Sequence, residues 1–305
     1  MILLDGQVAS KSIKQTLTLN TKRLVEEGKR PPHLAALLIG NNGASETYVG
    51  SKVRSCAEIG FTSTLLRFED NISQQDLITQ IELLNLEETI DGILVQLPLP
   101  SHIEEAAIIN TIDPEKDVDG FHPMSIGHMV QGIETFIPAT PFGIMLMLEH
   151  YKLSTKGKHA VVIGRSNIVG RPMSILLSSN LEYGNCTVTL CHRYTADLRS
   201  KTIVADIIVA AVGIPGFITA DMVKEGAIVI DIGITRVEDT STKSGYRLKG
   251  DVDFEPVSKK AFAITPVPGG VGPMTIAGLM KNTMDAYLRK IGTEKVIPLQ
   301  HEGRN

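Results

Sequence analysis

Short apolar runs alternate with helical patterns along the first part of this sequence. Three of the runs, residues 34–39, 64–68 and 92–96, are predicted to be buried strands. The helical patterns occupy residues 44–59, 73–86 and 102–110. Gly60 follows the first of these helices, where a C-cap needs a residue that tolerates positive φ. Alternating strands and helices predict parallel βαβ units with helices on both faces of the sheet.

A second series of the same kind begins after Pro138 and Pro141. A helix is predicted at residues 142–151, and apolar runs follow at residues 160–163, 186–191, 207–212, 227–232 and 262–264. This pattern predicts a second doubly wound parallel sheet. The interval between the series, residues 113–141, is rich in Pro and Gly and is interpreted as a linker.

Residues 272–291 are helical in pattern again, and a terminal helix after a completed sheet can fold back onto the first domain. We therefore predict an α/β protein of two lobes. An N-terminal domain would comprise residues 1–139 and be completed by residues 276–305. A Rossmann-like domain would comprise residues 140–275. The length of 305 residues also suggests about two domains.

Charge and cysteine content narrow the class of protein. The net charge of -4 provides no global field to attract nucleic acid or an anionic membrane. Three cysteines without a CxxC pair argue against a disulfide framework and a structural zinc site, so we expect no metal. The N-terminus lacks the basic and long apolar regions of a secretory signal, and the longest apolar runs are well short of the ~20 residues that span a bilayer. We expect a soluble cytoplasmic protein.

A glycine-containing turn, Gly164 to Gly170, lies between a predicted strand and a helical pattern. Ligands of open parallel sheets bind beyond the carboxyl ends of the strands. Small residues there allow close approach of a pyrophosphate to the N–H groups of a helix N-terminus. Ser166 stands where the second glycine of GxGxxG belongs, so the turn alone is equally compatible with a purely structural role.

The end of the next strand indicates which dinucleotide would bind. His192, Arg193 and Tyr194 follow residues 186–191, and there is no carboxylate for the ribose 2′-hydroxyl of NAD. Arg193 and Arg165 could instead pair with a 2′-phosphate, which favours NADP. The alternative is that both arginines are solvated loop residues. Gly213 and Ile234 follow later strands and can line the cofactor site, although alone they are ordinary strand-end residues.

Tyr48 and Lys52 are candidate functional residues of the first lobe. They are four residues apart and therefore lie on one face of the predicted helix. Lys52 either places its amine in a cleft or is a surface lysine. Gln96 ends a strand before a Pro-rich turn, where its neutral amide can orient an amine or a carbonyl, or simply satisfy the loop backbone.

Two further segments have candidate binding roles. Asp119 precedes Gly120, so it either makes a turn or accepts hydrogen bonds from an aminopyrimidine edge. In residues 265–275 the prolines restrict the backbone and the glycines carry no side chain. Both features suit a loop that packs against a flat ligand.

Five segments together resemble one enzyme family. They are TYVGSK (47–52), VQLPLP (95–100), DVDGFHP (117–123), GRSNIVGRP (164–172) and TPVPGGVGPMT (265–275). In this order they closely resemble the bifunctional methylenetetrahydrofolate dehydrogenase/methenyltetrahydrofolate cyclohydrolase family. The resemblance implies two α/β lobes flanking a cleft, a homodimer, and tetrahydrofolate one-carbon derivatives as substrates. It implies NADP-dependent oxidation of 5,10-methylenetetrahydrofolate, followed by hydrolysis of the methenyl cation to 10-formyltetrahydrofolate.

The resemblance also assigns roles to residues. Lys52 matches the catalytic lysine, Gln96 the glutamine that contacts it, Tyr48 the tyrosine on the folate ring and Asp119 the aspartate at the pterin edge. Further substrate contacts are expected at Val95, Leu97, Pro268, Gly269 and Gly270. Cofactor contacts are expected at Gly164, Arg165, Ser166, Gly213, Ile234 and Thr275. Many relatives have Ser where this chain has Arg193, which we expect to hold the 2′-phosphate.

The mechanism requires an uncharged Lys52. With an ordinary pKa of ~10.4 the amine would be cationic, whereas burial would favour the neutral form that can accept a proton from water. Two alternatives use the same lobes. One is an NADP dehydrogenase of a small hydroxy acid, such as a shikimate-like substrate, and the other is a catalytically silent nucleotide-binding regulator.

Overall fold

The chain divides into two compact units in a computed structural model that describes residues 1–242 and 245–293. Unit 1 contains Met1–Ser10 and Thr140–Thr275. Unit 2 contains Lys11–Ala139 and the described residues from Ile276 onward. Both units combine parallel strands with helices, which confirms the predicted α/β class.

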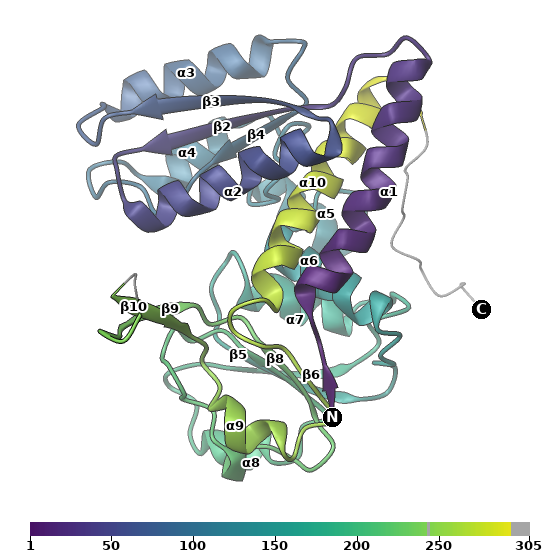
Figure 1. The fold of residues 1–305 in the computed structure, drawn as a ribbon, viewed down its shortest axis with the longest axis vertical. Helices are drawn as coiled ribbons and strands as arrows, with labels where there is room; N and C mark the ends of the chain where they lie inside the picture. The colour runs from purple at the N-terminus through teal and green to yellow at the C-terminus, as the bar shows by residue number, and fades with distance from the viewer. Residues whose placement is uncertain (243–244, 294–305) are drawn as a thin grey trace. The chain divides into compact units, whose positions relative to one another are not determined.

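Unit 2 is built on a three-stranded parallel sheet in the order β3-β2-β4. Its strands are β2 (His33–Ile39), β3 (Thr62–Phe68) and β4 (Gly92–Val95). The side chains of Ala35, Leu37 and Ile39 pack with apolar residues of α3 (Gln74–Leu86) and α4 (Glu105–Thr111). Helix α2 (Gly43–Ile59) covers the other face (Figure 1).

The details of unit 2 correct two expectations. Strand β3 is not buried, because it lies at the sheet edge and its side chains are half-buried or exposed. The interval 113–141 is not a linker, because it contains α5 (Pro123–Gln131). Pro123 lies in the first turn of this helix, and Gly132 ends it in the left-handed conformation. Gly60 caps α2 at φ 81°, as predicted.

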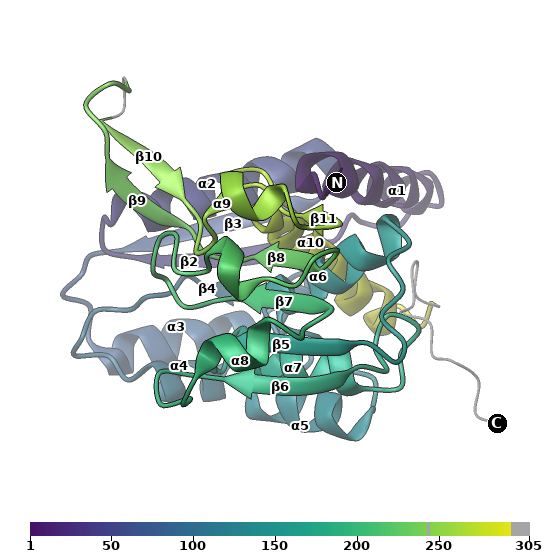
Figure 2. The same ribbon diagram turned by 90° about the horizontal axis from the view of Figure 1, so that it is seen from below.

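Unit 1 contains a six-stranded parallel sheet in the order β1-β11-β8-β7-β5-β6, of which Figure 2 shows the central strands side by side. Its strands are β1 (Ile2–Leu3), β5 (His159–Ile163), β6 (Thr187–Cys191), β7 (Ile207–Ala210), β8 (Ile228–Asp231) and β11 (Ala263–Ile264). Met1–Ser10 therefore belongs to unit 1 and not to the N-terminal domain, because β1 pairs with β11.

The helices of unit 1 flank this sheet. They are α6 (Ala139–His150), α7 (Gly170–Ser178), α8 (Leu198–Thr202), η1 (Ala220–Met222) and α9 (Phe254–Ser258). Residues of α8, η1 and α9 join one apolar cluster with the strands, while α7 contacts β5 and β6. Loops, and not helices, follow directly after the carboxyl ends of these strands.

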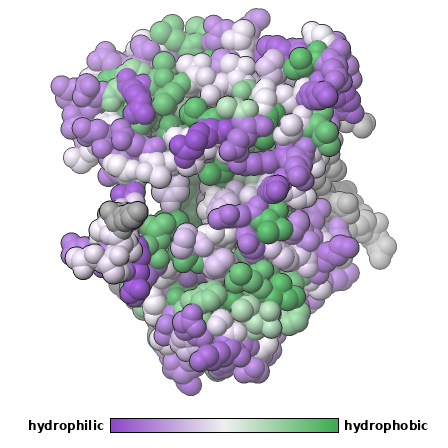
Figure 3. All heavy atoms as spheres, in the orientation of Figure 1, coloured by the Kyte–Doolittle hydropathy of each residue, from purple (hydrophilic) through white to green (hydrophobic). Residues whose placement is uncertain are grey.

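Several elements carry no prediction from the sequence. Among them are α1 (Gly6–Glu26) and the antiparallel hairpin of β9 (Thr235–Glu238) and β10 (Tyr246–Lys249). Helix α10 (Val271–Lys290) matches the predicted C-terminal helix. None of the helices in the described residues is long and apolar enough to cross a membrane. Polar side chains cover much of the face in Figure 3, with apolar patches between them.

All three cysteines, Cys56, Cys186 and Cys191, are free and buried. Burial raises the pKa of the Cys56 thiol to about 12 and that of Cys186 to about 11. It raises the pKa of Cys191 as well. These side chains act as small apolar residues in the core.

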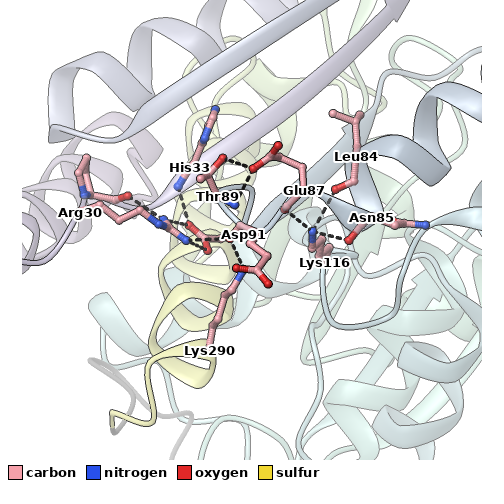
Figure 4. A network of polar contacts seen from close by, with 11 residues as sticks. Arg30, His33, Leu84, Asn85, Glu87, Thr89, Asp91, Lys116 and Lys290 are labelled. Carbon is pink, nitrogen blue, oxygen red and sulfur yellow. Dashed lines mark hydrogen bonds and ion pairs between the residues drawn. The ribbon is translucent and has the colours of Figure 1, made fainter.

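A polar network closes the amino-terminal edge of the unit 2 sheet (Figure 4). The Arg30 guanidinium donates to both oxygens of Asp91 at 2.7 Å, and the His33 N–H donates to the same carboxylate at 2.8 Å. Nearby, the Lys116 Nζ donates to three carbonyl oxygens at the end of α3, those of Leu84, Asn85 and Glu87. A cation at this position complements the negative end of the helix dipole.

Replacing Asp91 by Ala is expected to destabilise the fold. The substitution leaves the Arg30 guanidinium without its bidentate partner and removes the acceptor of the His33 N–H. Because Arg30 is partly exposed, we expect a loss of about 2 kcal/mol in the free energy of unfolding, below the usual cost of breaking a fully buried pair. Denaturant unfolding measures this change. Glu27→Ala, which removes an exposed ion pair with Lys29, is the control and should change stability by less than about 0.5 kcal/mol.

Candidate active site and cofactor-binding loops

Helix α2 carries Tyr48 and Lys52 on neighbouring turns. The Asn42 side chain accepts hydrogen bonds from the N–H groups of Ala44 and Ser45 and so fixes the start of the helix. The Lys52 side chain is buried, with 8% of the residue exposed, whereas Tyr48 is 37% exposed. Lys52 is therefore not a surface lysine.

Gln96, directly after β4, is the hydrogen-bond partner of Lys52. The Lys52 Nζ donates to Gln96 Oε1 at 3.1 Å. The Gln96 Nε2 donates to the carbonyl of Leu97 at 2.6 Å, which turns the amide oxygen toward the amine. Val95, which precedes Gln96 in the sequence, is the last residue of β4 and is buried. The Leu97–Pro98 peptide bond that follows Gln96 is cis.

Burial sets the electrostatics around Lys52. It lowers the pKa of the Lys52 amine below its ordinary value, while the nearby Asp119 carboxylate opposes the shift. Burial likewise raises the pKa of Asp119, and Lys52 opposes that shift. Asp119 is 9% exposed. The structure thus brings Lys52, Gln96 and Asp119 together in unit 2, with the charged forms of both titratable groups disfavoured by desolvation.

Asp117 shapes the loop that presents Asp119. Its carboxylate accepts hydrogen bonds from the N–H groups of Phe121 and His122 at 3.2 and 2.8 Å and from the Ser125 hydroxyl at 2.8 Å. Burial raises its pKa to about 7. Sequence reasoning missed this role, for which the only signal was an acidic residue three positions before Gly120.

Gly120 and Asn282 hold the same loop from its other side. Gly120 has φ +70°, and a Cβ there would lie 2.6 Å from the backbone of Ile137 and Pro138. The Asn282 Nδ2, on α10, donates to the carbonyls of Val118 and Ile137 at 2.8 and 2.9 Å. Asp119 is therefore presented by a fixed turn.

In unit 1, the turn between β5 and α7 allows only glycine at both of its ends. Gly164 has φ +116°, and a Cβ would lie 2.1 Å from the carbonyl oxygen of Ala211. A Cβ on Gly170 would lie 2.0 Å from the carbonyl oxygen of Gly164. The Ser166 hydroxyl accepts from the N–H groups of Val169 and Gly170 at 3.2 and 3.3 Å. Ser166 therefore ties the turn to the start of α7.

Arg165 and Arg193 come together at the ring of Tyr194. The guanidinium carbons lie 5.9 and 4.7 Å from the ring centroid, respectively. The Tyr194 N–H donates to Nδ1 of His192 at 3.2 Å, which holds the loop after β6. Two guanidinium groups from adjacent strand-end loops, beside a glycine turn at a helix N-terminus, fit the phosphates of a dinucleotide.

The remaining predicted cofactor and substrate residues also lie in unit 1. Gly213 has φ +72° and follows β7, and Ile234 is 40% exposed after β8. The hydroxyls of Thr275 and Thr140 are 3.0 Å apart. Pro268 follows a cis peptide bond, Gly269 accepts a hydrogen bond from the Gly6 N–H, and a Cβ on Gly270 would clash with the carbonyl of Pro266.

Comparison with known proteins identifies both parts of the chain. Residues 4–119 match the model of the tetrahydrofolate dehydrogenase/cyclohydrolase catalytic domain, and residues 138–291 match that of its NAD(P)-binding domain. A "Bifunctional protein FolD" of Flavobacterium johnsoniae is 59% identical over 295 residues, which is 97% of this chain and 99% of the relative.

Solved structures agree with this assignment. The bifunctional FolD methylenetetrahydrofolate dehydrogenase/cyclohydrolase of Campylobacter jejuni is 47% identical, with a TM-score of 0.89 over 95% of this chain and 99% of that chain. The Trypanosoma brucei enzyme, solved with NADP cofactor and an inhibitor, is 37% identical, with a TM-score of 0.90 over 95% of this chain and 98% of that chain. The chain therefore belongs to the tetrahydrofolate dehydrogenase/cyclohydrolase family.

Proposed function

We propose that this chain oxidises 5,10-methylenetetrahydrofolate with NADP and then hydrolyses the methenyl product to 10-formyltetrahydrofolate, with Lys52 as the proton-handling residue of the second step. Family membership supports the pair of reactions. The observation that carries the role of Lys52 is its buried amine, which donates to Gln96 and is desolvated enough to have a lowered pKa.

Hydrolysis needs a group that can both accept and return a proton. The neutral Lys52 amine accepts a proton from the water as its oxygen bonds to the methenyl carbon, and then donates that proton to the ring nitrogen as the carbon–nitrogen bond breaks. The remaining hydroxyl proton is released to water as the formyl C=O forms. Gln96 orients the amine through its amide oxygen and adds no charge. A neutral amine also avoids electrostatic repulsion of the cationic methenyl substrate, which a lysine with an ordinary pKa would cause.

The other residues of unit 2 position the folate. The Asp119 carboxylate accepts N–H groups from the aminopyrimidine edge, and Tyr48 packs on the ring system. Val95 and Leu97 supply further contacts with the substrate. Pro268, Gly269 and Gly270, which belong to unit 1, are also proposed as substrate contacts. Orientation of the reacting carbon dominates the oxidation step, because hydride transfer needs close approach and no acid or base.

NADP binds to unit 1. The residues that would hold it are Gly164, Arg165, Ser166, Arg193, Gly213, Ile234 and Thr275, and the two arginines would hold its 2′-phosphate. When bound, NADP supplies the hydride acceptor. The glycine turn, in which a Cβ at Gly164 or Gly170 would meet backbone atoms, supports close approach of the pyrophosphate to the main chain.

A direct assay tests the proposed function. Purified protein, NADP and 5,10-methylenetetrahydrofolate should yield NADPH absorbance, and 5,10-methenyltetrahydrofolate alone should lose its absorbance as it is hydrolysed. NADPH formation from a small hydroxy acid in place of the folate would favour the hydroxy-acid dehydrogenase. Binding of NADP without either reaction would favour the silent regulator.

We further infer that the protein is a cytoplasmic homodimer. Family resemblance supports the dimer, and three free cysteines support a reducing compartment. Light scattering of the purified protein gives the mass that tests the dimer. Fractionation of the source cells tests the location, with recovery in a membrane or secreted fraction counting against it.

A further inference from the structure

Asp231, at the carboxyl end of β8, is buried and uses both carboxylate oxygens as acceptors. Oδ1 accepts the N–H groups of Gly233 and Asp251, each at 2.9 Å. Oδ2 accepts the N–H of Val252 at 2.9 Å. The loop that follows β8 and the segment around residue 251 are thus held on one side chain.

Asp251 is fully buried and extends the same connection to β7. Its Oδ2 accepts the N–H groups of Val212 and Gly213 at 2.6 and 3.0 Å. Its Oδ1 is buried without a hydrogen-bond partner in the described residues. Asp231 and Asp251 together therefore join three segments at the carboxyl edge of the sheet, and Asp251 uses only one of its oxygens to do so.

Backbone packing leaves these two carboxylates little freedom. A Cβ on Gly233 would lie 2.3 Å from Asp251 Oδ1, and a Cβ on Gly250 would lie 1.9 Å from Asp231 Oδ2. No ion pair in residues 1–242 and 245–293 involves either acid. The hydrogen-bond donors to both carboxylates are main-chain N–H groups, and burying a carboxylate is an expensive arrangement for stability alone because its desolvation is costly.

The segments that this pair holds are those expected to contact NADP. Gly213 and Ile234 follow β7 and β8, where ligands of parallel sheets bind. We propose that Asp251, held by Asp231, is a positioning residue for NADP that fixes the loop at Val212 and Gly213 in the conformation that binds the cofactor. This inference rests on the proposed NADP-dependent oxidation.

Asp206 provides a matched control in the same sheet. It precedes β7, at the opposite edge, where it accepts the His159 N–H at 2.9 Å and the Lys224 Nζ at 2.6 Å. A purely structural aspartate should behave like Asp206. A positioning aspartate should change the KM for NADP and spare cyclohydrolase activity, which needs no NADP.

The experiment compares four variants in both assays. Asp251→Ala removes the acceptor of two partly buried N–H groups, and we expect the KM for NADP to rise about 10- to 100-fold, with cyclohydrolase activity within twofold of normal. Asp251→Asn can keep its carbonyl oxygen at the Oδ2 position, so we expect a rise of about threefold or less. Asp231→Asn loses an acceptor in either orientation, so its KM should rise by about tenfold or more. Asp206→Ala should leave the KM for NADP unchanged.

The contrary results are equally specific. An unchanged KM in Asp251→Ala, an equal rise in Asp206→Ala, or a parallel loss of both activities would overturn the positioning role. If Asp251→Ala fails to fold, the two Asn variants decide, and a greater effect at Asp251 than at Asp231 contradicts the proposal. Absence of NADPH formation by the unaltered protein would refute the proposed function instead.

Discussion

Replacing Lys52 by Gln is expected to abolish methenyl hydrolysis while leaving NADP binding intact. Gln keeps a polar side chain of similar reach but cannot accept a proton and return it to the substrate nitrogen. Loss of a general acid–base group costs about 10²- to 10⁴-fold in rate. The decay of methenyltetrahydrofolate absorbance measures the loss, and NADP titration by fluorescence checks the cofactor site. Lys52→Met should behave in the same way.

Lys14→Gln is the matched control for this substitution. Lys14 also contacts α2, with its Nζ 2.7 Å from the Ser55 hydroxyl and 2.9 Å from a Glu58 carboxylate oxygen, but it has no assigned part in the reaction. Its removal should leave hydrolysis within twofold of normal. Full hydrolysis in Lys52→Gln would refute the role of the amine.

The hydrolysis rate should also depend on pH, and the burial of Lys52 determines whether the rate rises or falls as the pH is lowered. Because burial lowers the pKa of this amine, its neutral form is populated at a lower pH than for an exposed lysine. The rate should fall as pH falls through that lowered pKa, since the protonated amine cannot accept a proton from water. Lys52→Gln should lose this dependence.

Arg193→Ser and Arg165→Ala are each expected to weaken NADP binding far more than NAD binding. Each guanidinium can donate charge-assisted hydrogen bonds to a 2′-phosphate, which NAD lacks. Loss of such bonds costs about 1.5–3 kcal/mol, or roughly 10- to 150-fold in affinity. Titration of each variant with both cofactors gives the ratio of dissociation constants, and the double variant should show the largest change in that ratio.

Arg199→Ser serves as the control for these variants. Arg199 lies on α8 of the same unit, where its exposed side chain pairs with Asp221 at 3.1 Å. It should leave both affinities unchanged. An equal loss of NADP and NAD affinity in Arg193→Ser would show that the arginine supports the loop and does not recognise the phosphate.

The sequence predicted the strands of both parallel sheets except β1, because parallel strands are apolar on both faces. The strand of residues 64–68 was wrongly predicted to be buried, since an edge strand keeps an apolar sequence while one side faces solvent. Helix α5 was not predicted, because the Pro and Gly residues that begin and end it were interpreted as the signal of a linker. The place of Met1–Ser10 could not be read from the sequence, because it depends on the pairing of β1 with a strand some 260 residues away.

The candidate site likewise contains residues that the sequence indicated and residues that it did not. Lys52, Gln96 and Arg193 stand at recognisable places in helices and strand ends, and the structure brings Lys52 into contact with Gln96 and Arg193 near Arg165. Asp117 and Asp251 were not singled out. Their partners are mainly backbone N–H groups, in the case of Asp251 as far as 39 residues away, and the identity of an aspartate says nothing about which amides surround it.

The buried cysteines have a practical consequence. Oxidants and alkylating reagents attack the thiolate, and the raised pKa values of Cys56, Cys186 and Cys191 keep all three sulfurs protonated at neutral pH. We therefore expect the folded protein to resist thiol oxidation in air, and we expect modification by a thiol reagent to report local or global opening of the chain.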